Sequence, residues 1–281
     1  MNLIYQIFQT IFPFEWSRYA FMVHAFLAIF LVTPLFGLIG TTVVNQKMAF
    51  FSDALGHSAL TGIAIGVLLG VDNYILSMIG FSLVFALAIS AVLDSGHSSA
   101  DTIIGVFSSV GLALGVVILS AQGGFQKYST YLIGDILTVQ PNEIAWLAIL
   151  FLLVVLLWCL FYNKLMLSGL SKAMAAGKNI PVRLLSKGFV LLIALLVTVS
   201  IKWIGVMIIN SLLVLPAAAA RNIAKSARSS HFLSMGFSLF SGISGLLISY
   251  YAGTAASGTI VLVAAVLFFL SLWIGKLKKS N

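Results

Sequence analysis

Long apolar runs separated by short polar or glycine-rich breaks make up most of the chain from Tyr19 onward. A run of about 20 apolar residues is long enough to cross the hydrocarbon core of a bilayer as a helix, so the pattern predicts an all-α, polytopic transmembrane helical bundle. The runs are Tyr19–Gly40, Ala49–Leu69, Tyr74–Leu93, Thr102–Ala121, Ile144–Tyr162, Gly188–Ile201, Gly205–Ala220, Phe232–Tyr251 and Thr259–Ile274. We therefore expect nine spans, or eight if one of the two runs beside Lys202–Ile204 is re-entrant or interfacial.

The composition also indicates a membrane protein and argues against nucleic-acid binding. Hydrophobic residues make up 61% of the 281 residues and charged residues only 8%, with a mean hydropathy of +1.13, so lipid rather than water is the expected solvent. The net charge of +8 does not indicate nucleic-acid binding, because most of the charges flank apolar runs. The single cysteine, Cys159, excludes disulfides within one chain and is expected to be a packing residue.

The distribution of basic residues predicts the topology. If the segment 163–187 is cytoplasmic, only the basic residues Arg18, Lys127 and Lys202 lie on the external side of the membrane. We therefore expect an external N-terminus, a cytoplasmic C-terminus and an odd number of spans. The basic residues then inside are Lys47, Lys164, Lys172, Lys178, Arg183, Lys187, Arg221, Lys225, Arg228, Lys276, Lys278 and Lys279. The expected organisation is an interfacial segment at 1–18, a transmembrane domain at 19–275 containing the cytoplasmic loop 163–187, and a basic cytoplasmic tail at 276–281.

Asp53 and His57 are the ionisable pair in the second run, where charge is costly. They stand four residues apart and share one helix face, which Thr61 continues. In one interpretation Asp53 caps the helix and His57 pairs with it. In the other, the carboxylate and the imidazole form part of a cation path, since together they suit zinc and also accept manganese. A neighbouring ridge of small residues, Ala54, Ser58, Gly62 and Gly66, predicts close approach of another helix.

Other candidates for chemistry are weaker. His24, His97 and His231 are each expected to be interfacial or hydrogen-bonded histidines, Asp101 to cap a helix and Asp135 to lie in a loop turn. No P-loop, H-E-x-x-H or G-x-S-x-G motif occurs, so we expect no ATP hydrolysis and no enzyme in this chain. We expect no permanently bound cofactor.

The segment 163–187 is the long basic loop. Ala173 and Gly177 lie in a predicted short helix that a glycine ends, and Pro181 starts a new direction. This segment is either an ordinary positive-inside loop or a docking surface for a cytoplasmic partner. Gly111, Gly115, Gly242 and Gly245 are expected to be helix-packing residues, and Pro216 to mark a kink or a helix end.

A resemblance to a known family extends from Tyr19 to Ile274. It rests on four stretches of the chain, which are GTTVVNQKMAFFSDALGHSALTGIAIG, DTIIGVFSSVGLALGV, SLLVLPAAAARN and GTIVLVAAVLFFLSL. They resemble the membrane permease subunits of bacterial ATP-binding-cassette importers for zinc and manganese. The resemblance implies a fold like that of the type II ABC importers for cobalamin and siderophores. It also implies a homodimer in the bacterial cytoplasmic (inner) membrane, a cytoplasmic ATPase dimer, and an extracytoplasmic metal-binding protein that delivers the ion.

The resemblance also assigns roles to residues. Asp53 and His57 match the family motif, and Ala173 and Gly177 match the alanine and glycine of the loop that docks on the ATPase. Leu167–Leu170 stand where relatives usually have acidic residues, and Gly253 and Ala255 stand where they usually have Asp and Pro. Asp135, in a Gly-Asp pair, looks more like the zinc importers, so zinc is preferred over manganese as the transported ion.

Two alternatives remain open on the residues alone. A secondary carrier would move the metal without an ATPase, and such carriers often show inverted repeats with paired broken helices; no second copy of the Asp53–His57 pattern occurs in the chain. A structural membrane scaffold would tolerate apolar replacements of both residues.

Overall fold

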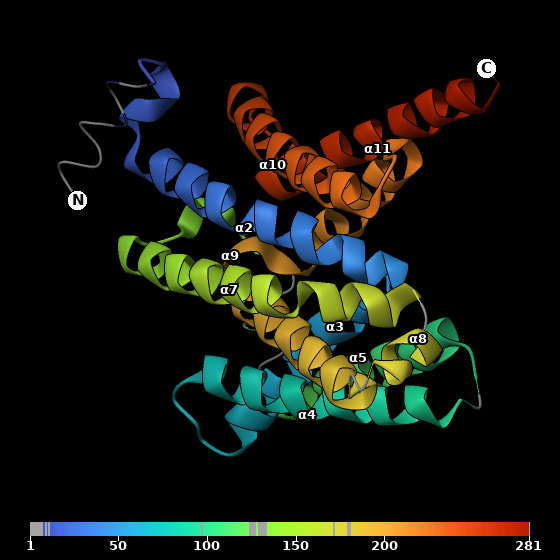
Figure 1. Ribbon diagram of the computed structural model, residues 1–281. Coiled ribbons are helices and arrows are strands. Elements are labelled where there is room, and N and C mark those ends of the chain that lie inside the picture. Colours follow the sequence, from blue (N-terminus) through green and yellow to red (C-terminus); the bar gives the residue numbers. More distant parts are fainter. Residues whose placement is uncertain are drawn as a thin grey trace. The chain divides into compact units, whose positions relative to one another are not determined.

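The computed structural model describes residues 8, 10, 12–96, 98–123, 128, 134–170, 172–178 and 181–280, and these form helices joined by short turns (Figure 1). In chain order the elements are η1(Glu15–Arg18), α2(Ala20–Asn45), α3(Phe51–Leu68), α4(Tyr74–Ser95), α5(Ala100–Ala121), η2(Ile136–Thr138), α7(Pro141–Leu170), α8(Lys172–Gly177), α9(Val182–Ile223), α10(Ala227–Ala252) and α11(Ala256–Ser280). The predicted all-α fold is confirmed.

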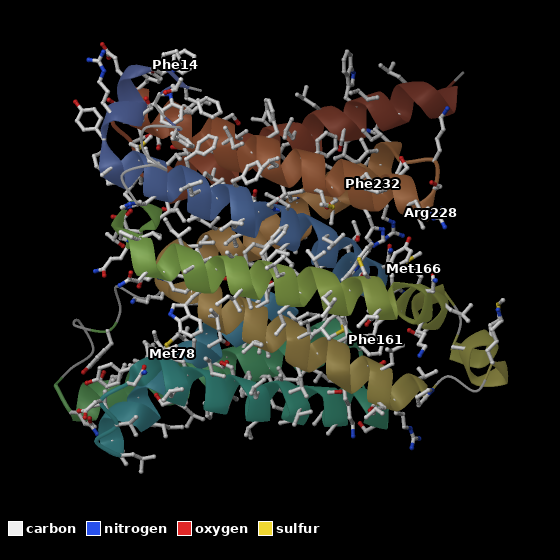
Figure 2. All side chains as sticks on the ribbon, turned by 60° about the vertical axis from the view of Figure 1, so that its left-hand side comes forward. Phe14, Met78, Phe161, Met166, Arg228 and Phe232 are labelled. Carbon is white, nitrogen blue, oxygen red and sulfur yellow. The ribbon has the colours of Figure 1, made fainter. Side chains whose placement is uncertain are left out.

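Eight of the described helices are long and apolar enough to cross a membrane. A ninth apolar helix, Ile208–Ile223, is shorter, so every predicted run corresponds to a helical segment. Large apolar side chains such as Phe232, which is 74% exposed, project outward from the helices (Figure 2). Such side chains are expected where lipid rather than water surrounds a helix bundle.

The chain divides into two compact units. The first unit comprises Met1–Thr41, Asp135–Val155 and Ser211–Asn281, and the second comprises Thr42–Gly134 and Leu156–Asn210. The first unit therefore contains most of α2, together with α10 and α11, and the second contains α3, α4, α5 and α8. The helices α7 and α9 contribute to both units.

In the first unit, small residues bring helices into close contact. A Cβ atom on Gly37 of α2 would lie 2.7 Å from the backbone oxygen of Ser234 on α10, and one on Gly245 would lie 2.5 Å from Cα of Ile260 on α11. Hydroxyl groups strengthen the first contact, since Ser238 on α10 donates a hydrogen bond of 2.7 Å to the carbonyl oxygen of Thr33 on α2. The packing role expected for Gly245 is confirmed, and Gly242 meets Thr33 in the same way.

The N-terminal segment of the first unit contributes aromatic side chains. Trp16 is 3% exposed and stacks on Phe26 of α2 with ring centroids 5.4 Å apart, while Phe8 meets the same ring edge-on at 5.3 Å. Residues 1–7, which belong to the predicted interfacial segment, lie outside the described part of the chain.

The helix α9 joins the sixth and seventh apolar runs across one break at Gly205. Gly205 has φ 77° and ψ 160°, a conformation that is essentially restricted to glycine. A Cβ atom on Gly134 would approach Cα of Gly205 to 2.4 Å, so both positions require glycine. The sequence indicated a break at Lys202–Ile204, but these three residues are helical, and the backbone change lies at the next residue. Pro216 does not end the helix, which continues to Ile223.

Two further expectations need correction. The fifth run was expected to end at Tyr162, but α7 continues to Leu170, because the polar residues Asn163 and Lys164 interrupt the hydropathy without disfavouring a helix. Cys159, expected to be a packing residue, is exposed on α7.

Candidate functional site

The helix α3, which carries Asp53 and His57, is embedded among α4, α5 and α9 within the second unit. Its glycines make this possible: a Cβ on Gly62 would lie 2.7 Å from Cα of Met78 on α4, and Gly56 faces the side chain of Val206 on α9. Glycines on α5 do the same from the other side, since a Cβ on Gly115 would lie 2.8 Å from the backbone nitrogen of Thr61. The close approach predicted from the small-residue ridge is confirmed.

Asp53 and His57 face each other on α3. The Nε2 atom of His57 lies 3.5 Å from Oδ2 of Asp53, as expected for a pair separated by one helical turn. The side chain of His57 is 29% exposed and that of Asp53 is 33% exposed. Both are therefore reachable from outside one chain, although the backbone that carries them is packed against protein.

The capping interpretation of Asp53 is not supported by the geometry. The residue before α3 is Phe50, no side chain caps the helix there, and Asp53 lies inside the first turn. Instead, Ser108 on α5 donates a hydrogen bond of 3.4 Å to Oδ2 of Asp53. One carboxylate oxygen thus faces both the serine hydroxyl and the imidazole of His57.

One ring nitrogen of His57 has no hydrogen-bond partner among the described residues. This atom is Nδ1, and it is buried. A carboxylate that faces one ring nitrogen of a histidine favours the tautomer with the proton on that nitrogen, which leaves a lone pair on the other. Nδ1 therefore keeps an unused lone pair at a position that is buried in the single chain.

Two more hydrogen bonds tie α3 to its neighbours near this pair. Ser52, the residue before Asp53, donates a hydrogen bond of 2.8 Å to Oδ1 of Asn210 on α9. Thr61 donates one to the carbonyl oxygen of Gly111 on α5. The helix is therefore held by polar contacts at its start and in its middle, and these contacts fix the direction in which Asp53 and His57 project.

Sequence analysis did not identify Ser52, Ser108 and Asn210. Asn210 carried a usable signal, because an amide inside an apolar run is expected to find a hydrogen-bond partner. Ser52 and Ser108 carried none, since serine is common in transmembrane helices and either residue could have bonded to its own backbone.

The remaining described candidate residues have structural roles. His24 on α2 hydrogen-bonds to the backbone of Val139, and Nδ1 of His231 lies 2.8 Å from the carbonyl oxygen of Ala227, so both are hydrogen-bonded histidines as expected. Asp135 accepts a hydrogen bond of 3.0 Å from the backbone nitrogen of Leu137, which confirms its role in a turn.

Asp101 does not cap α5. Ser99 does so instead, accepting a hydrogen bond from the backbone nitrogen of Thr102, because the cap position lies two residues earlier than the carboxylate. His97 lies outside the described residues.

The described residues contain no group of three or more His, Cys, Asp or Glu side chains that could hold a metal ion. Asp53 and His57 offer two side-chain ligands, fewer than the four of a structural zinc site.

Ala173 and Gly177 lie on the short helix α8, as the sequence predicted, and that helix ends at Gly177. The next helix begins at Val182, directly after Pro181. A Cβ atom on Gly177 would meet nothing within 4 Å, so this end of α8 has open space around it within the described chain.

Comparison with known proteins identifies the family. The model of the ABC 3 transport family matches residues 18–275. The chain is 33% identical over 236 residues to the high-affinity zinc uptake system membrane protein ZnuB of Haemophilus influenzae, covering 84% of this chain and 90% of the relative. It is 29% identical over 258 residues to the manganese transport system membrane protein MntC of Listeria innocua, covering 90% of each.

A solved structure agrees with the sequence relatives. PsaBC from Streptococcus pneumoniae, in complex with Fab, contains a chain that superposes with a TM-score of 0.79 at 26% identity and covers 96% of this chain and 95% of that one. The residues that the family model matches include α3, which carries Asp53 and His57. This protein belongs to the ABC 3 transport family.

Proposed function

We propose that this chain is the membrane-spanning permease subunit of an ATP-driven importer that moves a divalent transition metal into the cytoplasm. Zinc is the preferred ion and manganese the second. The observation that carries the proposal is the Asp53–His57 pair on α3, which presents a carboxylate and an imidazole, both partly exposed, from a helix otherwise packed by small residues. The names of the relatives, which include a zinc and a manganese system, support the ion class.

The incomplete ligand set motivates a second copy of the chain. Two chains related by a dyad would bring two carboxylates and two imidazoles together, which is a set of four ligands of the type that zinc takes. The partial exposure of both side chains leaves room for a partner to approach. A transport site should hold the ion less tightly than a structural site, because the ion has to be released.

The energy source lies outside this chain in the proposal. The sequence contains no P-loop, so a cytoplasmic ATPase dimer would dock on α8 near Ala173 and Gly177, while an extracytoplasmic metal-binding protein would deliver the ion. The host membrane would be the bacterial inner membrane. The open space around Gly177 suits a docking contact.

The decisive experiment measures metal uptake into proteoliposomes that contain the ATPase and the binding protein. Asp53→Asn removes the charge while keeping the size of the side chain, and His57→Leu removes the ligand nitrogen. Each variant should fold and assemble but lose uptake by roughly 10–100-fold, and the double variant should be little worse than either single one. Asp101→Asn, which removes a carboxylate away from the pair, is the matched control. Wild-type uptake in both folded single variants would exclude the site.

Two further measurements separate the alternatives. Metal movement into liposomes without any ATPase subunit would support a secondary carrier and overturn the ATP-driven proposal. Growth of cells that lack other importers, tested with each metal, reports the ion, and rescue by manganese alone would overturn the preference for zinc.

A further inference from the structure

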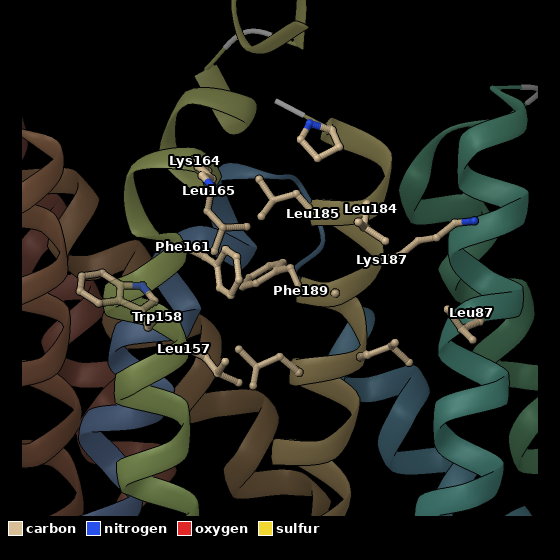
Figure 3. A pocket seen from close by; sticks show the side chains of 14 residues that line it. Leu87, Leu157, Trp158, Phe161, Lys164, Leu165, Leu184, Leu185, Lys187 and Phe189 are labelled. Atoms are coloured by element: carbon tan, nitrogen blue, oxygen red, sulfur yellow. The ribbon is translucent and has the colours of Figure 1, made fainter. Parts of the chain in front are cut away.

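A cavity of about 540 Å³ opens on the second unit between the end of α7 and the start of α9, and Leu87 of α4 closes its third side (Figure 3). This volume falls within the range of roughly 300–1,000 Å³ that is usual for small-molecule sites. The metal path proposed above does not use it, since neither Asp53 nor His57 is among the described residues that line it. The cavity therefore needs its own explanation.

Leucines make up half of the residues that line the cavity. They come from both helices and include Leu157 and Leu165 of α7 and Leu184, Leu185, Leu191 and Leu192 of α9. Leu184 is 70% exposed, so the cavity is open to the surroundings of the helices rather than sealed. In a chain that crosses a membrane, an open leucine-lined groove faces hydrocarbon, which makes a lipid acyl chain its natural occupant.

Two lysines give the groove one charged end. In Figure 3, Lys164 lies on α7 beside Leu165, Lys187 extends from α9 toward α4 on the other side of the groove, and Leu157 lies farther along α7 from both. Lys164 precedes α8 along the chain, and its ammonium group lies 5.9 Å from the ring centre of Phe161. No acidic side chain is among the described residues that line the cavity.

The charges lie where a headgroup would reach them. Leu157 is seven residues before Lys164 on α7, so the apolar groove extends about 10 Å along the helix from the lysine. Both lysines belong to the set that the positive-inside distribution assigns to the cytoplasm. Anionic lipids are attracted to basic pockets between transmembrane helices on that side.

We propose that the groove binds an anionic glycerophospholipid, with an acyl chain along the leucines and the headgroup at the end that carries Lys164 and Lys187. The apolar groove would accept the tail of any phospholipid, so the lysines determine selectivity. Each lysine near a membrane surface contributes roughly a fivefold preference for a negative headgroup, and the two together contribute roughly 20–30-fold.

Competition between lipids tests the proposal. The full-length chain is incubated with equal amounts of phosphatidylglycerol and phosphatidylethanolamine that carry identical acyl chains, and the retained lipids are identified by native mass spectrometry. The wild type should retain phosphatidylglycerol preferentially, and Lys164→Gln with Lys187→Gln should remove that preference. The control double variant, Lys225→Gln with Lys276→Gln, removes the same charge from exposed residues outside the groove and should keep it. Equal preference in the wild type and the groove variant would overturn the proposal.

A second variant tests the groove without changing charge. A Cβ atom on Gly188 meets nothing within 4 Å, and this residue lines the cavity, so Gly188→Phe should fill the groove without a backbone clash. It should reduce retention of both lipids, whereas Gly169→Phe, at an equally open position outside the cavity, should not. Unchanged retention in Gly188→Phe would place the bound lipid elsewhere and refute the assignment.

Two further experiments test whether a small anion or a second copy of the chain occupies the groove instead. If excess inorganic phosphate displaces phosphatidylglycerol completely, the lysines bind a small anion rather than a lipid and the proposal fails. If a second copy of the chain covers the groove, Leu184→Cys in a Cys159→Ser background should form a disulfide between two chains in native membranes. Formation of that disulfide would also overturn the lipid assignment, whereas its absence would support the assignment.

Discussion

Gly115 sets how closely α5 approaches the helix that carries the proposed metal pair, and replacing it with alanine tests that packing. A Cβ atom at this position would lie 2.8 Å from the backbone nitrogen of Thr61 and 3.0 Å from the backbone carbon of Leu60. Because these are backbone atoms, no side-chain rotation relieves the clash, and α3 and α5 must move apart. Overpacking of this kind costs about 1–3 kcal/mol of stability.

Gly105, on the same helix, provides the matched control. A Cβ atom at Gly105 would meet nothing within 4 Å, so Gly105→Ala carries only the intrinsic effect of the substitution. Alanine in a helix is favoured over glycine by about 0.5–1 kcal/mol. This gain applies equally at both positions and cancels in the comparison. Gly115→Ala should therefore be less stable than Gly105→Ala by about 1–3 kcal/mol.

Unfolding in mixed micelles by increasing mole fractions of SDS, followed by tryptophan fluorescence, measures the difference. Metal uptake in proteoliposomes should also fall in Gly115→Ala, because a displaced α3 moves Asp53 and His57. Equal stability of the two alanine variants would show that α3 and α5 are not in close backbone contact, and would refute the packing on which the site geometry depends.

Three further variants test other features of the chain. Gly205→Ala should lower the free energy of unfolding by at least about 1–3 kcal/mol, because alanine strongly disfavours φ 77° and ψ 160°. Thermal unfolding like that of the wild type would contradict this backbone conformation. Ser108→Ala removes the 3.4 Å hydrogen bond to Asp53 and should raise the KM for metal uptake by roughly 2–5-fold while leaving stability nearly unchanged. An unaltered KM would show that the serine does not position the carboxylate. Gly177→Val should lower transport-coupled ATP hydrolysis without unfolding the chain, since its Cβ meets nothing within 4 Å; ATPase stimulation equal to that of a Gly169→Val control would remove α8 from coupling.

The apolar pattern predicted the helical architecture because hydrophobic length is what a bilayer selects. The exact division of the sixth and seventh runs was not predictable in the same way. The sequence offers Lys202 as a polar break, yet the helix continues through it and changes direction at Gly205. A glycine is compatible with either a helix or a break, and the close approach of Gly134 to Gly205 is a tertiary contact that the local sequence does not show.

The candidate site divides similarly between what is local and what is tertiary. The Asp53–His57 pair was predictable because its two members are four residues apart on one helix, and the structure gives the expected contact. The hydrogen bonds from Ser108 to Asp53 and from Ser52 to Asn210 join residues separated by 55 and 158 positions, respectively. No periodicity encodes such distances, so these contacts follow only from the packing of α3 against α5 and α9.

The contact between α2 and α10 affects the order of events during biosynthesis. Ser234 donates a hydrogen bond of 2.6 Å to the carbonyl oxygen of Gly37, although 197 residues separate them along the chain. Synthesis proceeds from the N-terminus, so α2 enters the membrane long before the ribosome has made its partner. Until then Gly37 faces lipid or other proteins. Nascent chains arrested before Ala227 should therefore be the ones that an insertion chaperone holds and a membrane protease removes, and release of α10 should end both interactions.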